Sequence, residues 1–292
     1  MASPVLAARR VALADYVDLT KPRITLMVIL TAMVGFVVAS TEVRGVALLG
    51  MAAGTGLVAA GASALNMVLE RRTDARMLRT RMRPVPAGRV RPGEALAFGV
   101  ALTTAGLVAL YWLSGPLATA VALVTWTSYL FGYTPLKTVT SLSTVVGAFP
   151  GALPPVIGWA AARGAIDPGA LVLFAILFLW QIPHFLAIAW IYREDYARGG
   201  LPMLPVIDPE GRLTGRQAVA NSLALLLVSL TPAVAGMAGR VYLFGAIALG
   251  VLLTAMACRV AVKRNLAAAR GLFFASIVYL TGISALLIAD RP

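Results

Sequence analysis

The sequence predicts an all-α, polytopic membrane protein with about nine membrane-spanning helices. Hydrophobic residues make up 60% of its 292 residues, whereas charged residues make up only 13%. Soluble domains are typically about half apolar and about a quarter charged. A helix needs about 20 apolar residues to cross the hydrocarbon core of a bilayer, and apolar stretches near that length recur along this chain. We therefore expect residues 1–292 to form a single transmembrane domain.

Nine apolar segments have a length suited to a membrane span. The fourth is short, and we expect it to be tilted or partly interfacial. Short loops join the segments, and no low-complexity linker or separate soluble domain interrupts them. The nine segments are Ile24–Ser40, Val46–Leu65, Ala95–Leu113, Leu117–Phe131, Ser141–Ala161, Gly169–Ile191, Gln217–Gly236, Val241–Ala261 and Leu272–Ala289.

The basic residues are unevenly divided between the two sides of the membrane. With the N-terminus inside, all but four of the 25 Lys and Arg residues lie on the inner side. Cytoplasmic loops of membrane proteins carry such an excess, so we predict an N-in, C-out topology. Basic loops beside anionic lipid also explain the net charge of +13 without a nucleic-acid partner. The four outer residues are Arg44, Arg163, Arg240 and Arg291.

The N-terminus does not have the pattern of a cleaved signal peptide. After Arg9 and Arg10 the apolar stretch is broken by Asp15 and Asp18, and no small-residue cleavage site follows. The segment is also too short and too acidic for an organelle transit peptide. We therefore expect the prokaryotic plasma (inner) membrane as the location. The single cysteine, Cys258, lies in an apolar run and is interpreted as a packing residue.

The densest charged segment, NMVLERRTDARMLRTRMRP, directly follows the second apolar segment and runs from Asn66 to Pro84. It contains no Gly, and no Pro before its last residue, so we expect the helix to continue to Arg83. Asn66, Glu70 and Asp74 then recur every four residues and share one helix face. Glu70 has no basic residue three or four positions away, and a buried carboxylate requires a cation.

These three oxygen-bearing side chains predict a metal site. Hard oxygen ligands suit Mg²⁺, which typically binds one or two carboxylates together with substrate phosphate. The arginines that follow, among them Arg71, Arg79 and Arg83, would then bind a diphosphate. The alternative is a solvated, salt-bridged helix extension that follows the positive-inside rule. The residues of this segment alone leave both interpretations open.

Five further motifs accompany this segment in order along the chain. They are DLTKPRITLM (Asp18–Met27), YTPLK (Tyr133–Lys137), GALPPVIGW (Gly151–Trp159), WQIPHF (Trp180–Phe185) and YREDYARGGLPMLPV (Tyr192–Val206). As a set they resemble the UbiA-type intramembrane prenyltransferases, and more narrowly the haem-modifying branch of that family. The last three apolar segments match the family in hydropathy only.

The resemblance implies a UbiA-like helical bundle that transfers the farnesyl group of farnesyl diphosphate to a vinyl group of haem B, with haem O as product. It implies Mg²⁺ as the cofactor, held by Asn66, Glu70 and Asp74, whereas haem B is a substrate. Lys137 would join these residues in catalysis by contacting the diphosphate. Membrane lipid would surround the protein, and a downstream haem-modifying oxidase is a further candidate partner.

Several of the implied site residues also have a structural interpretation. Lys137 could equally be an interfacial lysine, and His184, the single histidine, could be a ligand of haem iron or a helix-packing residue. Glu194 and Asp195 resemble a second acidic motif, but Arg198 could pair with Glu194 at i,i+4, which leaves a second Mg²⁺ open. The implied substrate-binding residues are Arg71, Arg79, Arg83, Tyr133, His184, Arg193, Glu194 and Asp195.

Two other functions stand as alternatives. A UbiA-type transferase acting on a quinone-precursor aromatic ring would share the chemistry of Asn66–Asp74, but it would not require WQIPHF or YREDY. A membrane transporter could also be built from nine helices with an internal repeat. The acidic pairs that follow the second and sixth segments look like a weak repeat of this kind. Transporters more often place ionisable residues at mid-membrane, whereas here they collect at the inner rim. The transporter therefore ranks below the two transferases.

Overall fold

The computed structural model describes residues 12–291, and its regular secondary structure is entirely helical. Within these residues, eight helical segments are long and apolar enough to cross a membrane, which identifies a multi-pass membrane protein of the predicted all-α class. The expectation about the N-terminus rests partly on Arg9 and Arg10, which lie outside the described residues. The eight segments are α2 (Pro22–Ala39), α3 (Gly45–Leu69), α5 (Pro92–Ser114), the pair α8 (Ser143–Ala152) and α9 (Pro154–Arg163), α10 (Pro168–Ile191), the pair α13 (Arg212–Val228) and α14 (Thr231–Val234), α15 (Arg240–Lys263) and α16 (Leu266–Ala289).

Shorter helical segments complete the described fold. They are α1 (Leu13–Leu19), α4 (Arg71–Asp74), α6 (Pro116–Thr127), the π-helix η1 (Ser128–Tyr133), α7 (Thr134–Leu136), α11 (Arg193–Gly199) and α12 (Leu204–Ile207). The predicted fourth span, Leu117–Phe131, falls on α6 and η1. These two segments and α7 follow one another without a gap, but none has the length of a spanning helix by itself. The count of nine spans therefore stays a prediction.

Prolines divide two of the predicted spans. The fifth span is continuous in hydropathy, but the helix breaks at Leu153 because Pro154 and Pro155 have no N–H to continue the hydrogen-bond ladder. The seventh span is divided in a similar way, where Pro232 lies in the first turn of α14. By contrast, α10 runs through Pro183 without a break. Hydropathy thus locates the spans but not the breaks within them.

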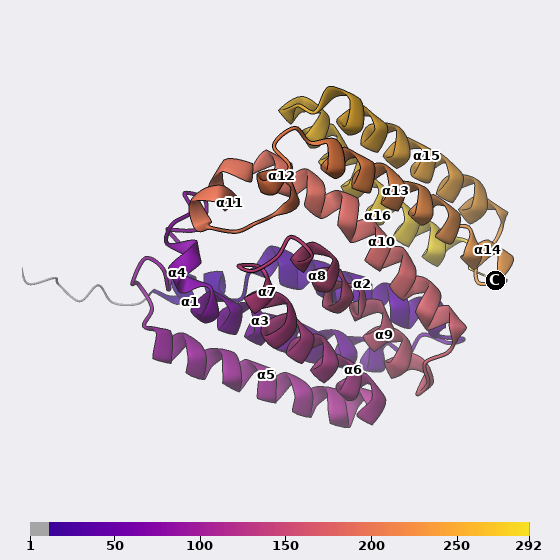
Figure 1. Ribbon diagram of the computed structural model, residues 1–292. Helices are drawn as coiled ribbons and strands as arrows, with labels where there is room; N and C mark the ends of the chain where they lie inside the picture. The colour runs from indigo at the N-terminus through magenta and orange to yellow at the C-terminus, as the bar shows by residue number, and fades with distance from the viewer. Residues whose placement is uncertain (1–11, 292) are drawn as a thin grey trace, which may run out of the picture.

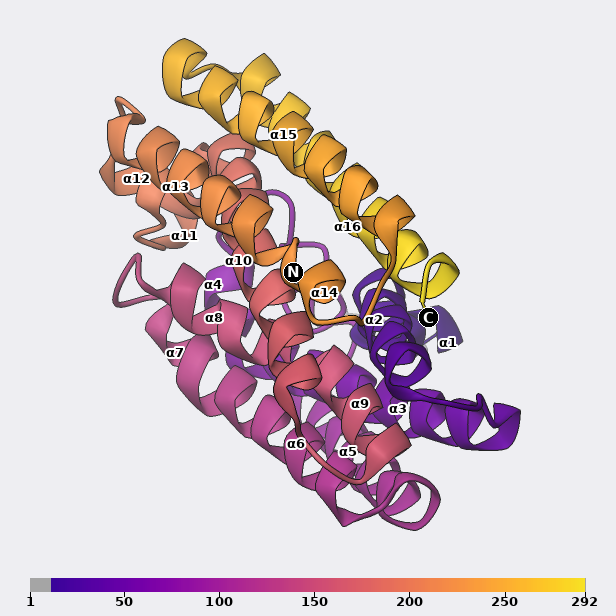
Figure 2. The same cartoon turned by 90° about the vertical axis from the view of Figure 1, so that its right-hand side faces the viewer.

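The long helices form a bundle in which α5 and α15 lie at opposite edges (Figures 1 and 2). In one half, α3 packs against α5 and α2, and α2 packs against α9. In the other half, α10 contacts α13 and α16, and both of these contact α15. The short helices α4, α11 and α12 lie at one end of the bundle, the end that also carries α1 (left in Figure 1). The two acidic segments of the sequence therefore meet at the same end.

The contact between α3 and α5 depends on two pairs of facing glycines. Gly54 and Gly61 are seven residues apart on α3, and Gly99 and Gly106 are seven residues apart on α5. A Cβ atom on Gly61 would lie 2.7 Å from the Gly99 carbonyl oxygen, and one on Gly106 would lie 2.8 Å from the Gly54 oxygen. Small residues let membrane helices approach this closely. The contact positions the end of α3 that carries Asn66.

Gly61→Ala should lower the free energy of unfolding by about 1–3 kcal/mol, and this loss should appear as a lower unfolding temperature in detergent. The added methyl group would meet backbone atoms of α5, and this cost outweighs the gain of about 1 kcal/mol that alanine brings to a helix. Gly271→Ala is the matched control, because the nearest atom to its Cβ would be the Met256 sulfur at 3.7 Å. Thermal-shift measurements should find the control neutral or stabilised. An unchanged unfolding temperature for Gly61→Ala would contradict this account of the helix pair.

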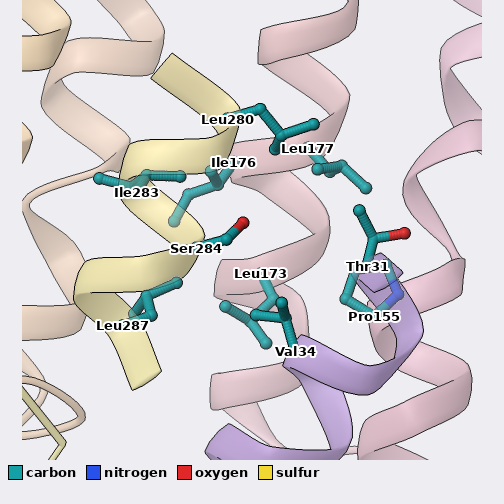
Figure 3. Close-up of a pocket in the computed structure, with 10 residues that line it drawn as sticks. All are labelled: Thr31, Val34, Pro155, Leu173, Ile176, Leu177, Leu280, Ile283, Ser284 and Leu287. Carbon is teal, nitrogen blue, oxygen red and sulfur yellow. The ribbon is translucent and has the colours of Figure 1, made fainter. Parts of the chain in front are cut away.

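A small apolar crevice lies where α2, α9, α10 and α16 meet (Figure 3), and its volume is about 20 Å³. It is lined by Thr31, Val34, Pro155, Leu173, Ile176, Leu177, Leu280, Ile283, Ser284 and Leu287. Thr31, Leu177 and Leu280 also line a much larger cavity. The crevice therefore lies beside that cavity, between α2 and α16.

Candidate active site

A cavity of about 850 Å³ lies within the bundle, and its walls are mostly apolar side chains from α2, α3, α8, α9, α10 and α16. Small-molecule sites in proteins run from about 300 to 1,000 Å³. The charged residues of the lining lie near helix ends, at the end of the bundle that carries α4. They are Lys21, Arg23, Glu70, Asp74, Arg79, Arg83 and Lys137. An apolar chamber with a charged rim suits a ligand that has an apolar body and a charged head.

Asn66, Glu70 and Asp74 keep the predicted four-residue register. The Glu70 amide donates to the Asn66 carbonyl at 2.9 Å, and the Asp74 amide donates to the Glu70 carbonyl at 2.8 Å. All three residues line the cavity. The prediction that the helix continues to Arg83 is wrong, because α4 ends at Asp74 and a series of turns follows.

The chain leaves the helix after Asp74 because other groups satisfy its backbone. The amides of Leu78 and Arg79 donate to the two carboxylate oxygens of Asp195 at 2.8 and 3.0 Å. The Thr80 hydroxyl donates to the Asp74 carbonyl at 2.9 Å. Backbone groups at a helix end need such partners. The partner here comes from a residue 117 positions away from Leu78, so the local pattern contains no sign of it.

Lys137 supplies the cation that Glu70 lacks within its own helix. Its Nζ lies 2.8 Å from Glu70 Oε1, and both side chains are largely shielded from solvent. Burial alone would raise the pKa of Glu70, but the ammonium groups of Lys137 and Lys21 outweigh it and hold this pKa below its ordinary value. Glu70 is therefore a carboxylate at neutral pH.

Lys21 is a site residue that the sequence interpretation misses. Its Nζ donates to Asn66 Oδ1 at 2.7 Å, and Asn66 Nδ2 donates to the Thr134 hydroxyl at 3.1 Å. Lys21 has a left-handed backbone with φ of 46°, a conformation that costs a non-glycine residue about 1–3 kcal/mol. Burial, reinforced by the Arg83 cation, lowers the pKa of Lys21 to about 8. The signal that could have found it is its place in the DLTKPRITLM motif.

Asp74 leaves one carboxylate oxygen for a ligand. The residue is 1% exposed, and its Oδ2 accepts a hydrogen bond from Arg83 at 2.7 Å. Its Oδ1 has no hydrogen-bond partner in residues 12–291, although the side chain lines the cavity. Two carboxylates and the Asn66 amide would leave coordination positions for phosphate oxygens and water, as Mg²⁺ sites commonly do. The donor set therefore fits the predicted Mg²⁺, although the described residues contain no group of three His, Cys, Asp or Glu side chains.

The predicted substrate-binding residues divide into two groups. Arg79, Arg83, Tyr133 and His184 line the cavity, whereas Arg71, Arg193, Glu194 and Asp195 do not. In the second group Asp195 is buried and the other three residues are exposed. The geometry therefore gives the second group no direct contact with a ligand in the cavity.

Asp195 connects the two acidic segments. Arg198 Nη2 lies 2.9 Å from Asp195 Oδ1, so Arg198 pairs with Asp195 and the alternative pairing with Glu194 is not seen in residues 12–291. Arg198 forms its ion pair with Asp195, which is buried, whereas Glu194 is exposed to solvent. Burial would raise the pKa of Asp195, but hydrogen bonds from the Arg79 amide, the Arg198 side chain and the Leu78 amide hold this pKa below its ordinary value. Asp195 therefore stabilises the backbone of the rim at Leu78 and Arg79, although it does not line the cavity itself.

Asp195→Ala should lower the unfolding temperature and reduce turnover without changing the Mg²⁺ concentration needed for half-maximal activity. Two backbone amides would lose their acceptor, at a cost of about 1–3 kcal/mol each, but no ligand of the predicted metal would be lost. Glu194→Ala is the control, because it removes the neighbouring carboxylate from an exposed position. A higher Mg²⁺ requirement in Asp195→Ala would instead indicate a metal ligand.

Aromatic rings line the cavity beside the charged rim. Trp126 comes from α6, and Tyr129 and Tyr133 come from η1, which is the kind of π-helical turn often found at functional sites. Lys137 Nζ lies 4.8 Å from the centroid of the Tyr133 ring. Ring faces of this kind attract cations. The rim can therefore bind an anion, while the adjacent wall can stabilise a cation.

His184 lines the cavity about 10 Å along α10 from its end at Ile191. Its ring stacks with those of Trp180 and Phe273, at centroid distances of 4.8 and 5.1 Å. Its Nδ1 lies 2.7 Å from the hydroxyl oxygen of Ser276 on α16. Ser276 is a second residue that the sequence interpretation misses, because it lies in a segment that carries no motif.

The sequence of this chain is similar to those of known prenyltransferases. The profile of the UbiA prenyltransferase family matches residues 28–278. The chain belongs to this family. Among its UbiA-family relatives, a protoheme IX farnesyltransferase from Solibacter usitatus is 49% identical over 95% of this chain and 99% of its own length. Another protoheme IX farnesyltransferase, from Koribacter versatilis, is 42% identical over 96% of this chain and 94% of its own.

Solved structures confirm the predicted UbiA-like fold. A digeranylgeranylglyceryl phosphate synthase matches with a TM-score of 0.80 at 16% identity, over 95% of this chain and 98% of its own. A UbiA homologue from Archaeoglobus fulgidus, bound to GPP and Mg²⁺, matches with a TM-score of 0.68 at 16% identity, over 94% and 99% of the two chains. Similarity at such low identity concerns the fold alone.

Proposed function

We propose that this UbiA-family protein transfers the farnesyl group of farnesyl diphosphate to a vinyl group of haem B and so produces haem O. Its relatives named protoheme IX farnesyltransferase match along nearly the whole chain. The observation that carries the proposal is the cluster of carboxylates and surplus cations at the rim of a large apolar cavity. The cavity suits an isoprenoid tail and a planar acceptor, whereas the rim suits a diphosphate. Because it is lined by residues from α2 to α16, we assign residues 1–292 to a single prenyltransferase domain.

The rim carries more positive than negative charge. Lys21, Arg79, Arg83 and Lys137 line it together with only two carboxylates, both within Asn66–Asp74. An incoming diphosphate would receive hydrogen bonds from the Lys and Arg side chains. Arg83 and Lys137 now neutralise the two carboxylates, those of Asp74 and Glu70. Once the diphosphate attracts these cations, the two carboxylates and the Asn66 amide would hold the Mg²⁺ that accompanies it.

The reaction begins with cleavage of the C1–O bond of farnesyl diphosphate, which releases diphosphate and leaves an allylic cation. Bound Mg²⁺ supplies positive charge that stabilises the leaving diphosphate. Lys21 and Lys137 are placed to hydrogen-bond to the same leaving group. The ring faces of Trp126 and Tyr129 are placed to stabilise the allylic cation. The vinyl group attacks that cation, and water then adds to the haem-side cation and loses a proton to give the hydroxyl group of haem O.

The acceptor is expected to lie in the apolar part of the cavity, beside α10 and α16. Among the described residues of the lining, His184 carries the only imidazole, and imidazole is a common ligand of haem iron. We propose that His184 contacts the haem iron. The product would then pass to a haem-modifying oxidase, which is the remaining proposed partner.

The decisive experiment incubates the detergent-purified protein with haem B, farnesyl diphosphate and Mg²⁺ and identifies the product by mass spectrometry. We expect haem O, and we expect none when any one of the three is omitted. A parallel reaction replaces haem B with a quinone-precursor aromatic acid. Prenylation of the aromatic acid and not of haem B would refute the proposal in favour of the other transferase. Absence of any prenylated product would contradict both transferases.

We also propose that the protein lies in a prokaryotic inner membrane with the charged rim on the cytoplasmic side, as the positive-inside rule predicts. Cys258 is exposed in the structure, contrary to the packing role expected from the sequence. In a Cys258→Ser background, which removes this thiol, Arg163→Cys should react with a membrane-impermeant maleimide in intact cells. Arg81→Cys should react only after the membrane is opened. Both positions are exposed in the structure, so labelling reports the side of the membrane and not burial. Labelling of Arg81→Cys in intact cells would contradict the topology.

A further inference from the structure

The hydrogen bonds of Ser276 decide where His184 carries its proton. Ser276 is 0% exposed, and its hydroxyl oxygen lies 2.6 Å from the Phe273 carbonyl oxygen and 2.7 Å from His184 Nδ1. A serine hydroxyl has one proton to donate, and a carbonyl oxygen can only accept. The Ser276 proton is therefore donated to Phe273, and the contact with His184 requires Nδ1 to be the donor.

This arrangement leaves a lone pair on the other ring nitrogen. A neutral imidazole has a single N–H, so protonation at Nδ1 leaves Nε2 as an acceptor or a metal ligand. No hydrogen bond to Nε2 occurs within residues 12–291. His184 lines the cavity and Ser276 does not, so Nδ1 is directed into the protein, and Nε2 is left available on the cavity side.

The orientation of the His184 ring is held by more than one contact. Trp180 Nε1 donates to the Ser276 carbonyl at 2.6 Å, which ties α10 to α16 one turn from His184. The His184 ring stacks on both Trp180 and Phe273, with interplanar angles of 22° and 26°. The backbone and side chain of Ser276 thus fix two neighbouring rings of the WQIPHF motif.

We propose that Ser276 is a positioning residue that holds the Nδ1-protonated tautomer of His184, so that Nε2 presents its lone pair to the iron of the haem acceptor. This inference rests on the proposed function, because it takes haem B as the substrate. Metal-binding histidines usually donate their second ring N–H to a fixed acceptor, which sets both the tautomer and the ring orientation. Here that acceptor is a serine on the last spanning helix.

The test is a titration of haem B into the purified protein, followed by its absorption spectrum. Wild-type protein should show the spectrum of histidine-ligated haem, and His184→Ala should lose it. Ser276→Ala should weaken haem affinity by about 10–100-fold, as the loss of such a second partner typically does, and should shift the spectrum toward that of His184→Ala. Ser276→Thr keeps the hydroxyl and should restore both. Ser284→Ala, two turns further along α16 in the small crevice, is the matched control and should behave as wild type.

The possible results separate the two proposals. Equal haem affinity and an equal spectrum in Ser276→Ala and wild type would overturn the role of Ser276. A wild-type spectrum identical to that of His184→Ala would overturn the contact between His184 and iron, while haem O production by the wild type would still support the proposed function. Farnesyl diphosphate affinity should be unchanged in all variants, because that ligand belongs to the rim. A loss of both affinities in Ser276→Ala, with no rescue by threonine, would make Ser276 a purely structural residue.

Discussion

Asp74→Asn is expected to reduce turnover by about 10³-fold or more while the protein remains folded. The substitution keeps the shape of a side chain that is 1% exposed, but it removes the charge that faces both Arg83 and the cavity. The bound diphosphate would lose the positive charge that Mg²⁺ would supply there, so the loss should appear in kcat at saturating farnesyl diphosphate. Glu70→Gln should behave in the same way. Haem O formation, measured by mass over a series of Mg²⁺ concentrations, provides the readout.

Glu194→Gln is the matched control for both substitutions. It removes a carboxylate near the same end of the bundle, but from an exposed position outside the cavity. We expect near-wild-type turnover and unchanged Mg²⁺ dependence in this variant. Full activity of Asp74→Asn and Glu70→Gln at limiting Mg²⁺ would refute the metal site at Asn66, Glu70 and Asp74.

Lys137→Met should lower both the unfolding temperature and turnover. It leaves the largely buried Glu70 without the ammonium group that lies 2.8 Å away, and breaking such a pair typically costs about 3–5 kcal/mol when it is fully buried. Because both side chains keep some contact with solvent, we expect the lower end of that range. The same change removes a proposed hydrogen bond to the leaving diphosphate.

The double variant Lys137→Met/Glu70→Gln separates these two effects. Removing both charges leaves neither member of this ion pair without its partner, so the unfolding temperature should return most of the way to that of wild type. Turnover should stay as low as in the less active single variant, because the diphosphate and metal contacts are both gone. Recovery of turnover together with stability would show that the pair only supports the fold. Thermal unfolding in detergent and haem O formation are the two measurements.

The sequence alone determined the features that depend on local chemistry. Apolar length and charge content predicted the membrane spans, because the hydrocarbon core selects for both. The four-residue spacing of Asn66, Glu70 and Asp74 predicted their common face, because helical periodicity is a local property. The order of the motifs predicted the family, and the family match spans residues 28–278.

Only the tertiary structure decided which groups these residues meet. Lys21 is 45 residues from Asn66, Lys137 is 67 residues from Glu70, and Ser276 is 92 residues from His184. No local pattern specifies such partners, because they depend on which helices pack together and how deeply each side chain is buried. The end of α4 follows the same rule, since a carboxylate 117 residues away, on Asp195, accepts the amide hydrogen bond of Leu78. The helix ends there because the folded chain offers its backbone another hydrogen-bond partner. Hydropathy and helix propensity are local properties and cannot predict such a partner.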